Sequence, residues 1–439
     1  METIKHFNMR DRRMLYIAAA AAPLAAYTGF RLFRSLATLK RRPVNAQHHV
    51  IPSPRHSLQL LSAQDLNSLP YPPNALPGAR DVDTPYGNIR VYEWGPEDGR
   101  KVLLVHGIST PCIALANLAD SLVGKGCRVM LFDLFGRGYS DTPDPARYPQ
   151  DTQLFSSQIL CVLASSKLAW TGPNRFTLVG YSLGGGIGAS FASYFPELVE
   201  GLVLIAPSGL LRPKHISAKS KLLYGNLLPQ SLINYYVGNR LRGGPPSVWR
   251  QNSNSTGSNS GNPEATTTGA IQAAESEAPS TSPSSHPAQA PNSSAPIFPD
   301  RPAISPANAV GWQVDAHPGF VPAFISSIQH APITEQHERW RLIGHRQEAA
   351  RTSSNNKPDA LQSSGAAAAA GVALKEKKVL ILLGKQDSVI IADEVEEDAS
   401  KAMGKENVEV VRLEGGHDVP IVGAKECGEA IATFWKRER

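Results

Sequence analysis

Residues 176–189 read FTLVGYSLGGGIGA: a β-branched, apolar run stops at Gly180, and an Ala- and Gly-rich helical pattern begins after Ser182. The pattern Gly-x-Ser-x-Gly therefore lies between a predicted strand and a predicted helix. Such an abrupt turn strains the serine backbone, and the flanking glycines leave room because they lack a Cβ. The hydroxyl then faces the N–H groups and dipole of a helix N-terminus, which favour a developing oxyanion. Ser182 is thus a candidate nucleophile. A phosphate-binding loop would need a lysine just before the helix, and none is there.

A nucleophilic serine needs a base, and the base needs an orienting acid. Because the carboxyl ends of parallel strands converge on one crevice, the remaining strand ends should supply both. Asp387 follows the predicted strand 378–383, and His417 follows the predicted strand 408–413 after two glycines. The chain order Ser182, Asp387, His417 is the one expected for a serine on a strand-to-helix elbow.

Each of these residues also has a simpler interpretation. A single histidine in a loop, such as His417, is most often a bystander, and Asp387 is typical of a residue that caps the following helix. Asp418 is a second candidate acid by adjacency, but neighbouring side chains point apart. The alternative acid position, residues 206–209 after the predicted strand 202–205, reads Ala-Pro-Ser-Gly and has no carboxylate. This absence favours Asp387.

Continuous apolar strands alternate with helices in two parts of the chain, residues 81–208 and 373–439. This alternation is typical of a parallel sheet that is covered on both faces. We therefore expect an α/β fold with a mostly parallel central sheet and helices on both faces. The predicted strands are 88–94, 101–105, 128–132, 176–181, 202–205, 378–383 and 408–413, and the predicted helices are 112–123, 152–169, 183–195, 389–401 and 424–435.

The two parts of this sheet domain are separated by a mostly helical insertion over residues 209–347. Within it, residues 251–299 consist largely of Ser, Asn, Thr, Pro, Ala and Gly. Such a composition cannot bury enough apolar surface to fold, so disorder is expected there. Residues 348–372 are expected to be a second low-complexity linker.

The first 42 residues carry an apolar run, 14–30, with basic residues on both sides and Pro23 near its middle. The run is at the short limit for crossing a bilayer. We expect a membrane anchor, with a mitochondrial targeting segment or a simple N-terminal helix as alternatives. Residues 43–80 are rich in proline and are expected to form a connector over the surface, regular only around 58–69.

The 439 residues are 41% hydrophobic and 19% charged, which suffices for a sizeable core. The net charge is +6, but the basic excess is concentrated in the first 42 residues, so no nucleic-acid partner is expected. The four cysteines form no Cys-x-x-Cys pair, and no histidine cluster has zinc spacing. We expect buried thiols, no metal site and no cofactor.

Over residues 81–208 and 373–439 the chain resembles the alpha/beta-hydrolase family. The motifs that carry this resemblance are His106-Gly107, Asp133-x-x-Gly136-x-Gly138-x-Ser140, Gly180-x-Ser182-x-Gly184 and Gly415-Gly416-His417.

The resemblance implies a nucleophile at Ser182, an acid at Asp387 and a base at His417. It further implies an oxyanion hole made by the backbone N–H groups of Ile108 and Leu183.

The resemblance also implies that His106 has a structural role, in shaping the loop that carries the Ile108 N–H. It implies that Asp133 and Arg137 shape the turn after their strand. A helical lid is expected where residues 209–347 lie, although the low-complexity tract inside it departs from the family pattern.

The expected reaction is acyl transfer to water. An apolar, aromatic lid favours a hydrophobic or lipid-like carboxylic ester, cleaved through an acyl-enzyme on Ser182. A serine at this position excludes the dehalogenases and epoxide hydrolases of the fold, which use an aspartate there. Thioesterases, carbon–carbon bond hydrolases and peptidases remain open, as does a catalytically silent, membrane-associated binding protein.

Overall fold

The computed structural model describes residues 49–216, 220, 223–225, 228–242, 295–355 and 372–437. The expected N-terminal anchor, most of the tract 251–299 and most of the linker 348–372 lie outside these residues. Among the described residues, no helix combines the length and apolar character needed to cross a bilayer.

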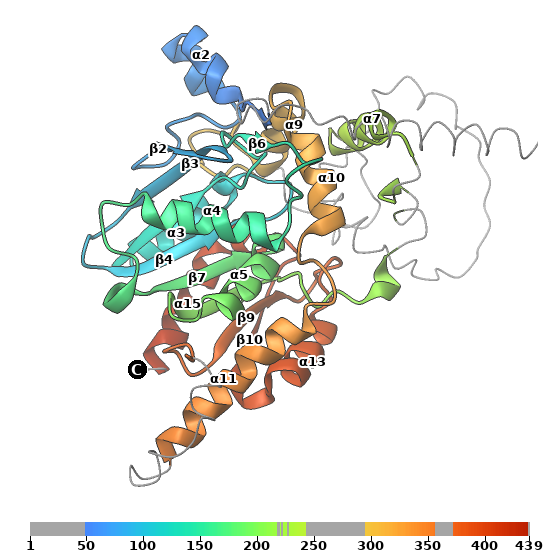
Figure 1. Cartoon of the computed structure of the whole chain (residues 1–439). Coiled ribbons are helices and arrows are strands. Elements are labelled where there is room, and N and C mark those ends of the chain that lie inside the picture. Colours follow the sequence, from blue (N-terminus) through green and yellow to red (C-terminus); the bar gives the residue numbers. More distant parts are fainter. Residues whose placement is uncertain are drawn as a thin grey trace, which may run out of the picture. The chain divides into compact units, whose positions relative to one another are not determined.

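The strands and helices follow the predicted alternation (Figure 1). The strands are β1 Val50–Ile51, β2 Arg80–Thr84, β3 Gly87–Trp94, β4 Arg100–Val105, β5 Cys127–Phe132, β6 Thr142–Pro143, β7 Phe176–Tyr181, β8 Val199–Ile205, β9 Val379–Gly384 and β10 Val408–Leu413. The α-helices are α2 Ala63–Ser68, α3 Ala116–Val123, α4 Thr152–Ala164, α5 Leu183–Tyr194, α7 Gln230–Leu241, α9 Pro306–Ala316, α10 Phe320–His330, α11 His337–Asn355, α13 Ala392–Met403, α14 Val419–Val422 and α15 Ala424–Arg437. Short 3-10 helices are η2 Pro54–Leu60, η3 Cys112–Leu115, η4 Gly172–Asn174, η5 Pro213–His215 and η9 Lys405–Asn407.

The central sheet has eight strands in the order β10-β9-β8-β7-β4-β5-β3-β2. The pairs from β10 to β5 are parallel, whereas β5–β3 and β3–β2 are antiparallel. The strand that precedes Ser182, β7, lies inside the parallel part between β4 and β8. The sheet is therefore mostly parallel, as predicted, and its carboxyl ends meet around β7.

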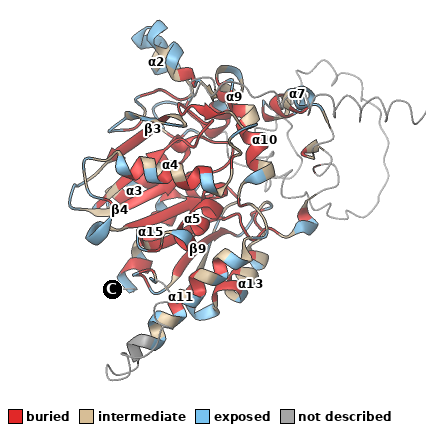
Figure 2. Ribbon diagram, viewed as in Figure 1, coloured by how far each residue is buried: buried red, intermediate tan, exposed pale blue. Residues whose placement is uncertain are grey.

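Helices cover the sheet in two groups. On one side α5 packs against β7 and β8 and contacts α4 and α11, which in turn contacts α13. A separate group joins α15 to α3, which packs on β5. Figure 2 shows the sheet and the inner helix faces buried, while outward helix faces are intermediate or exposed.

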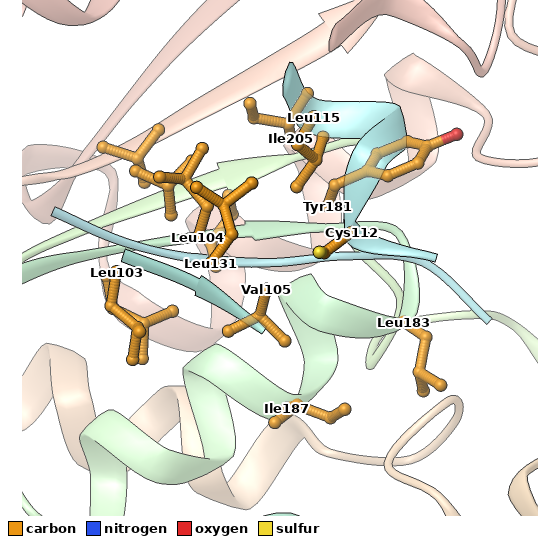
Figure 3. Packing of buried hydrophobic residues seen from close by; sticks show 14 of the residues in the cluster. Leu103, Leu104, Val105, Cys112, Leu115, Leu131, Tyr181, Leu183, Ile187 and Ile205 are labelled. Atoms are coloured by element: carbon orange, nitrogen blue, oxygen red, sulfur yellow. The ribbon is translucent and has the colours of Figure 1, made fainter. Parts of the chain in front are cut away.

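The core is formed by side chains on both faces of the parallel strands. Along β4, Leu103, Leu104 and Val105 are all fully buried. Figure 3 shows Leu103 and Val105 on one face of the strand, toward Ile187 of α5, and Leu104 on the other face. Burial on both faces explains why this strand reads as a continuous apolar run rather than as an alternating pattern.

Three expectations about segment boundaries were wrong. The connector 43–80 does not simply run over the surface, because Tyr71 is fully buried and packs 4.8 Å from the Tyr139 ring. Residues 295–299, expected to be disordered, include Ile297, which is 2% exposed. Helix α11 continues to Asn355, past the expected start of the linker at residue 348, and its last turns include an ion pair between Glu348 and Arg351.

Helix α11 also changes the extent of the insertion. The sequence predicts that most of this helix belongs to the lid, but it packs against α5 and α13, and its Trp340 is fully buried. It therefore belongs to the helical layer of the sheet domain. Helix α4 ends at Ala164, five residues before the predicted end at 169.

Candidate active site

Ser182 lies at a tight elbow between β7 and α5. Its backbone has φ 52° and ψ −116°, a region that L-residues rarely adopt. A Cβ built on Gly180 would lie 2.2 Å from the carbonyl oxygen of Gly184, and one on Gly184 would lie 2.1 Å from that of Val105. Both glycines are therefore required by close backbone contact, which is the physical basis of the sequence pattern.

Asp387 and His417 are brought to Ser182 by two neighbouring loops. His417 Nε2 lies 2.9 Å from Ser182 Oγ, and His417 Nδ1 lies 2.9 Å from Asp387 Oδ2. The loops touch through their backbones, since a Cβ on Gly384 would lie 2.3 Å from the Gly416 carbonyl oxygen. The three predicted side chains thus form one continuous hydrogen-bonded chain, at the place where the ends of β7, β9 and β10 meet.

Asp387 bonds His417 and also two backbone N–H groups of the loop before α13, but it does not cap that helix, which begins at Ala392 rather than at 389. While Oδ2 bonds His417, Oδ1 accepts hydrogen bonds of 2.8 Å from the backbone N–H groups of Val389 and Ile390. The carboxylate side chain is fully buried. Two backbone donors therefore fix the carboxylate in place while its second oxygen orients the imidazole.

The surroundings of the triad limit access of water to it. Ser182 is 7% exposed and His417 8%. The ring of Tyr181 lies 5.4 Å from the His417 ring, centre to centre. In such an enclosed site, hydrogen bonds and charges interact more strongly than they would in water.

The two predicted oxyanion donors belong to Leu183, next to Ser182 in the chain, and to Ile108, next to Gly107. Leu183 is the first residue of α5, so its N–H has no acceptor within the helix. Ile108 follows β4 in a loop, and a Cβ built on Gly107 would lie 3.5 Å from the Ser182 Cβ. This loop, residues 107–110, is called the oxyanion loop below.

His106 supports the oxyanion loop from beneath. Its Nε2 accepts the N–H of Leu134 at 2.9 Å, so the proton is on Nδ1, which donates to the carbonyl of Gly107 at 2.8 Å. Burial, with a smaller contribution from the charge of Arg137, lowers the pKa of His106 to about 3. A neutral histidine with both nitrogens occupied fits the structural role implied for it.

Asp133 shapes the turn that follows β5. Its carboxylate accepts the backbone N–H groups of Cys112 and Tyr139, both at 2.9 Å, and the hydroxyl of Tyr71. A Cβ on Gly138 would lie 2.1 Å from Asp133 Oδ2, so the motif needs glycine there. Burial raises the pKa of Asp133.

Sequence reasoning missed the polar contacts that the inserted helices make with this region. Gln313 of α9 accepts the N–H of Gly138 at 2.8 Å and donates to the carbonyl of Ser109 at 3.0 Å. His317, just after α9, bonds the carbonyl of Ser140 through Nε2 at 2.9 Å and accepts the N–H of Gly319 through Nδ1 at 3.2 Å. No motif marks these residues, because their partners are backbone groups far away in the sequence.

His106 and His317 predict a loss of stability in acid. Burial lowers the pKa of His317 to about 4. In both histidine rings one nitrogen accepts a hydrogen bond from a backbone N–H. Protonation of that nitrogen would place two hydrogen-bond donors against each other. Because both pKa values lie below the unfolded value of about 6.5, the unfolded state binds more protons as pH falls. The free energy of unfolding should fall by about 1.4 kcal/mol per pH unit for each histidine, from pH ~6 down to the folded pKa of about 4 for His317 and about 3 for His106.

Urea unfolding of the wild-type chain and of His317→Gln at pH 7 and pH 5 checks this expectation. The glutamine cannot titrate, so the variant should show a shallower dependence on pH, by about one proton. Equal pH slopes in the two proteins would contradict the assignment.

Within the described ranges, no group of three or more His, Cys, Asp or Glu side chains is arranged to hold a metal ion. All four cysteines are free, and Cys112, Cys127 and Cys427 are buried.

Comparison with known proteins gives matches over the nucleophile region. A family model described as alpha/beta hydrolase fold matches residues 101–253. A serine hydrolase-like protein of Mus musculus is 35% identical over 121 residues, which cover 28% of this chain and 37% of the mouse protein. A serine hydrolase-like protein of Homo sapiens is 33% identical over 135 residues, or 30% of this chain and 63% of the human protein. The alignments thus span from about a third to under two thirds of these relatives.

Among solved structures, a membrane phospholipase A described as a novel bacterial virulence factor aligns over 97% of both chains, with 18% identity and a TM-score of 0.47. The match over residues 101–253 and the geometry of the chain itself both indicate the alpha/beta hydrolase fold. The order of the parallel strands, the strained serine elbow and the convergence of Asp387 and His417 on it accompany that match. The chain therefore has the alpha/beta hydrolase fold, and the sequence match to that fold covers residues 101–253.

Proposed function

We propose that this chain is a serine hydrolase that cleaves carboxylic esters with a hydrophobic or lipid-like group, through an acyl-enzyme on Ser182. The observation that carries the proposal is the continuous chain of hydrogen bonds from Ser182 Oγ through His417 to Asp387, with both distances at 2.9 Å. This is the arrangement in which a base can take a serine proton while an acid holds the imidazole.

The first half of the reaction forms the acyl-enzyme. As Ser182 Oγ attacks the ester carbonyl carbon, His417 Nε2 takes its proton, and the carbonyl oxygen becomes an oxyanion near the N–H groups of Leu183 and Ile108. The C–O bond to the alcohol then breaks, and the imidazolium returns its proton to the leaving oxygen. Asp387 keeps the Nδ1 proton oriented throughout.

In the second half, a water molecule replaces the alcohol. His417 takes a proton from the water as its oxygen attacks the acyl carbon, and the same oxyanion donors act again. The bond to Ser182 Oγ then breaks, the serine regains a proton from His417, and the carboxylic acid leaves.

The proposed preference for a hydrophobic group is supported by the apolar character of Leu183, which directly follows Ser182, and of Ile108, which directly follows Gly107. The aromatic residues of the insertion support it less than expected. Phe320 and Phe324 are fully buried, and Trp312 packs against Tyr139 at 5.2 Å between ring centres.

Labelling by a fluorophosphonate probe, with the modified peptide identified by mass spectrometry, tests the proposal. Modification of Ser182, together with hydrolysis of p-nitrophenyl esters and monoacylglycerols of graded length, would support it. Parallel assays with thioester, peptide and carbon–carbon bond substrates would identify a different acyl or bond type. A folded chain that is neither labelled nor active would instead support a silent binding protein.

We also propose that residues 14–30 attach the chain to a membrane, with a mitochondrial targeting segment as the alternative outcome. The proposal is supported only by the apolar run and its basic flanks. Retention of the full chain in a carbonate-washed membrane pellet, and release of a chain that begins at residue 49, would favour attachment by this segment. Import with cleavage would favour the targeting segment.

A further inference from the structure

Arg137 is a fully buried arginine beside the oxyanion loop. Its Nε donates to the carbonyl of Ile108 at 3.0 Å, and another nitrogen donates to the carbonyl of Phe135 at 3.0 Å. The third nitrogen donates to Ser327 Oγ in α10 at 2.9 Å. One guanidinium therefore connects the loop that carries a proposed oxyanion donor with a helix of the insertion.

The charge on Arg137 has no carboxylate partner in the part of the chain that the structure describes. Burial lowers its pKa to about 9, so the side chain is still protonated at neutral pH. A buried charge without a counter-ion is costly unless oxygen acceptors surround it. All three guanidinium nitrogens are occupied in this way, a geometry that the single ammonium group of lysine cannot reproduce.

A second contact from the insertion holds the same loop. Gln313 of α9 donates to the carbonyl of Ser109, next to the carbonyl that Arg137 holds, and also accepts the N–H of Gly138. Two successive carbonyls of the oxyanion loop are thus bonded to side chains that α9 and α10 supply or contact. These two contacts add to the one that His106 makes with the carbonyl of Gly107.

We propose that Arg137 is a positioning residue that couples α10 to the oxyanion loop, so that α9 and α10 act as a fixed support for the Ile108 N–H rather than as a lid that opens. The inference rests on the proposed function, because the oxyanion donor matters only if Ser182 attacks a carbonyl. Removing the Ser327 hydroxyl leaves one guanidinium N–H buried without an acceptor. The side chain should then shift toward another oxygen and displace the Ile108 carbonyl with it.

The sharpest test compares Ser327→Ala with Ser326→Ala. The two serines are neighbours in α10, and both are almost fully buried. Ser326 Oγ accepts the N–H of Gln150 at 3.0 Å and does not contact Arg137 or the oxyanion loop in the described contacts. We expect kcat for ester hydrolysis to fall by about tenfold in Ser327→Ala with KM unchanged, because displacement of one oxyanion donor affects mainly the transition state. The rate of fluorophosphonate labelling should fall in parallel, and Ser326→Ala should leave both rates unchanged.

A second pair is Arg137→Lys and Arg100→Lys. Arg100 makes partly buried ion pairs, to Glu376 and Glu200, but it does so at the start of β4. Arg137→Lys should lose more activity than Ser327→Ala, whereas Arg100→Lys should keep wild-type kcat. Urea unfolding of each variant separates a loss of fold from a loss of positioning, and the serine pair remains decisive if Arg137→Lys does not fold.

The outcomes separate the two proposals. A wild-type chain that is folded but neither labelled nor active would overturn the proposed function, and this inference with it. A wild-type chain that is active, with equal kcat and equal labelling rates in Ser327→Ala and Ser326→Ala, would overturn the coupling through Arg137 alone.

Discussion

Replacing Ser182 with alanine is expected to lower kcat for ester hydrolysis by about 10⁵-fold or more, because no other group can form the acyl-enzyme. The structure gives reasons to expect that the fold survives. Alanine keeps a Cβ, so the strained backbone at φ 52° is no worse than in the serine protein. The substitution removes the hydrogen bond between the serine hydroxyl and His417 Nε2. Steady-state kinetics with the preferred ester, together with urea unfolding, measures both effects.

Ser193→Ala is a matched control for this experiment. Ser193 lies in the same helix α5, is 1% exposed, and donates from its hydroxyl to the Ser190 carbonyl at 2.7 Å. It should lose a little stability and no activity. If Ser182→Ala hydrolysed esters within tenfold of wild type, the assignment of the nucleophile would be wrong.

The parallel sheet and the triad could be predicted from sequence because each depends on local signals. A strand buried on both faces has a continuous apolar run, and β7 and β10 have the predicted bounds. The glycines at 180 and 184 are needed by backbone contacts within the elbow and with β4, so the motif carries its geometry with it. Asp387 and His417 come directly after strand ends, where the topology of a parallel sheet places side chains together.

The interactions that were missed depend on residues distant in the sequence. Tyr71 reads as part of a proline-rich connector, yet its hydroxyl bonds Asp133 in the turn after β5. In the antiparallel strand β2, charged and apolar residues alternate over too few positions to predict a strand from sequence. This strand pairs with β3. Composition and periodicity indicate which face of a segment is buried. They do not indicate which distant residues that face will contact.

The insertion shows the same limit in the site itself. Arg137 lies within the motif Asp133-x-x-Gly136-x-Gly138-x-Ser140, but only the fold shows that its third nitrogen reaches Ser327, 190 residues later in the chain. Gln313 has no motif at all. The sequence therefore predicted which groups could react, whereas the groups that would hold the oxyanion loop became visible only when α9 and α10 were placed against it.

The second large effect is expected for Asp387→Asn, which should lower kcat by about 10⁴-fold with little loss of stability. In the wild-type chain Oδ1 accepts two backbone N–H groups and Oδ2 accepts the His417 Nδ1 proton. Asparagine has only one acceptor oxygen, which is best placed on the two backbone donors. Its amide N–H₂ then faces His417 and donates to Nδ1, which moves the imidazole proton to Nε2. In that tautomer the histidine can no longer accept the proton of Ser182.

The variants Asp387→Asn and Asp387→Ala should differ in stability. Alanine also removes the acceptor for the N–H groups of Val389 and Ile390, so we expect an added loss of about 1–3 kcal/mol in the free energy of unfolding.

Asp418→Asn tests the alternative acid. This variant should keep kcat within a few-fold of wild type because the Nδ1 contact of His417 goes to Asp387. Steady-state kinetics and urea unfolding of the three variants provide the measurements. A large loss of kcat in Asp418→Asn, with near wild-type activity in Asp387→Asn, would reverse the assignment. The oxygen that orients His417 would then have to come from Asp418 rather than from Asp387, which follows β9.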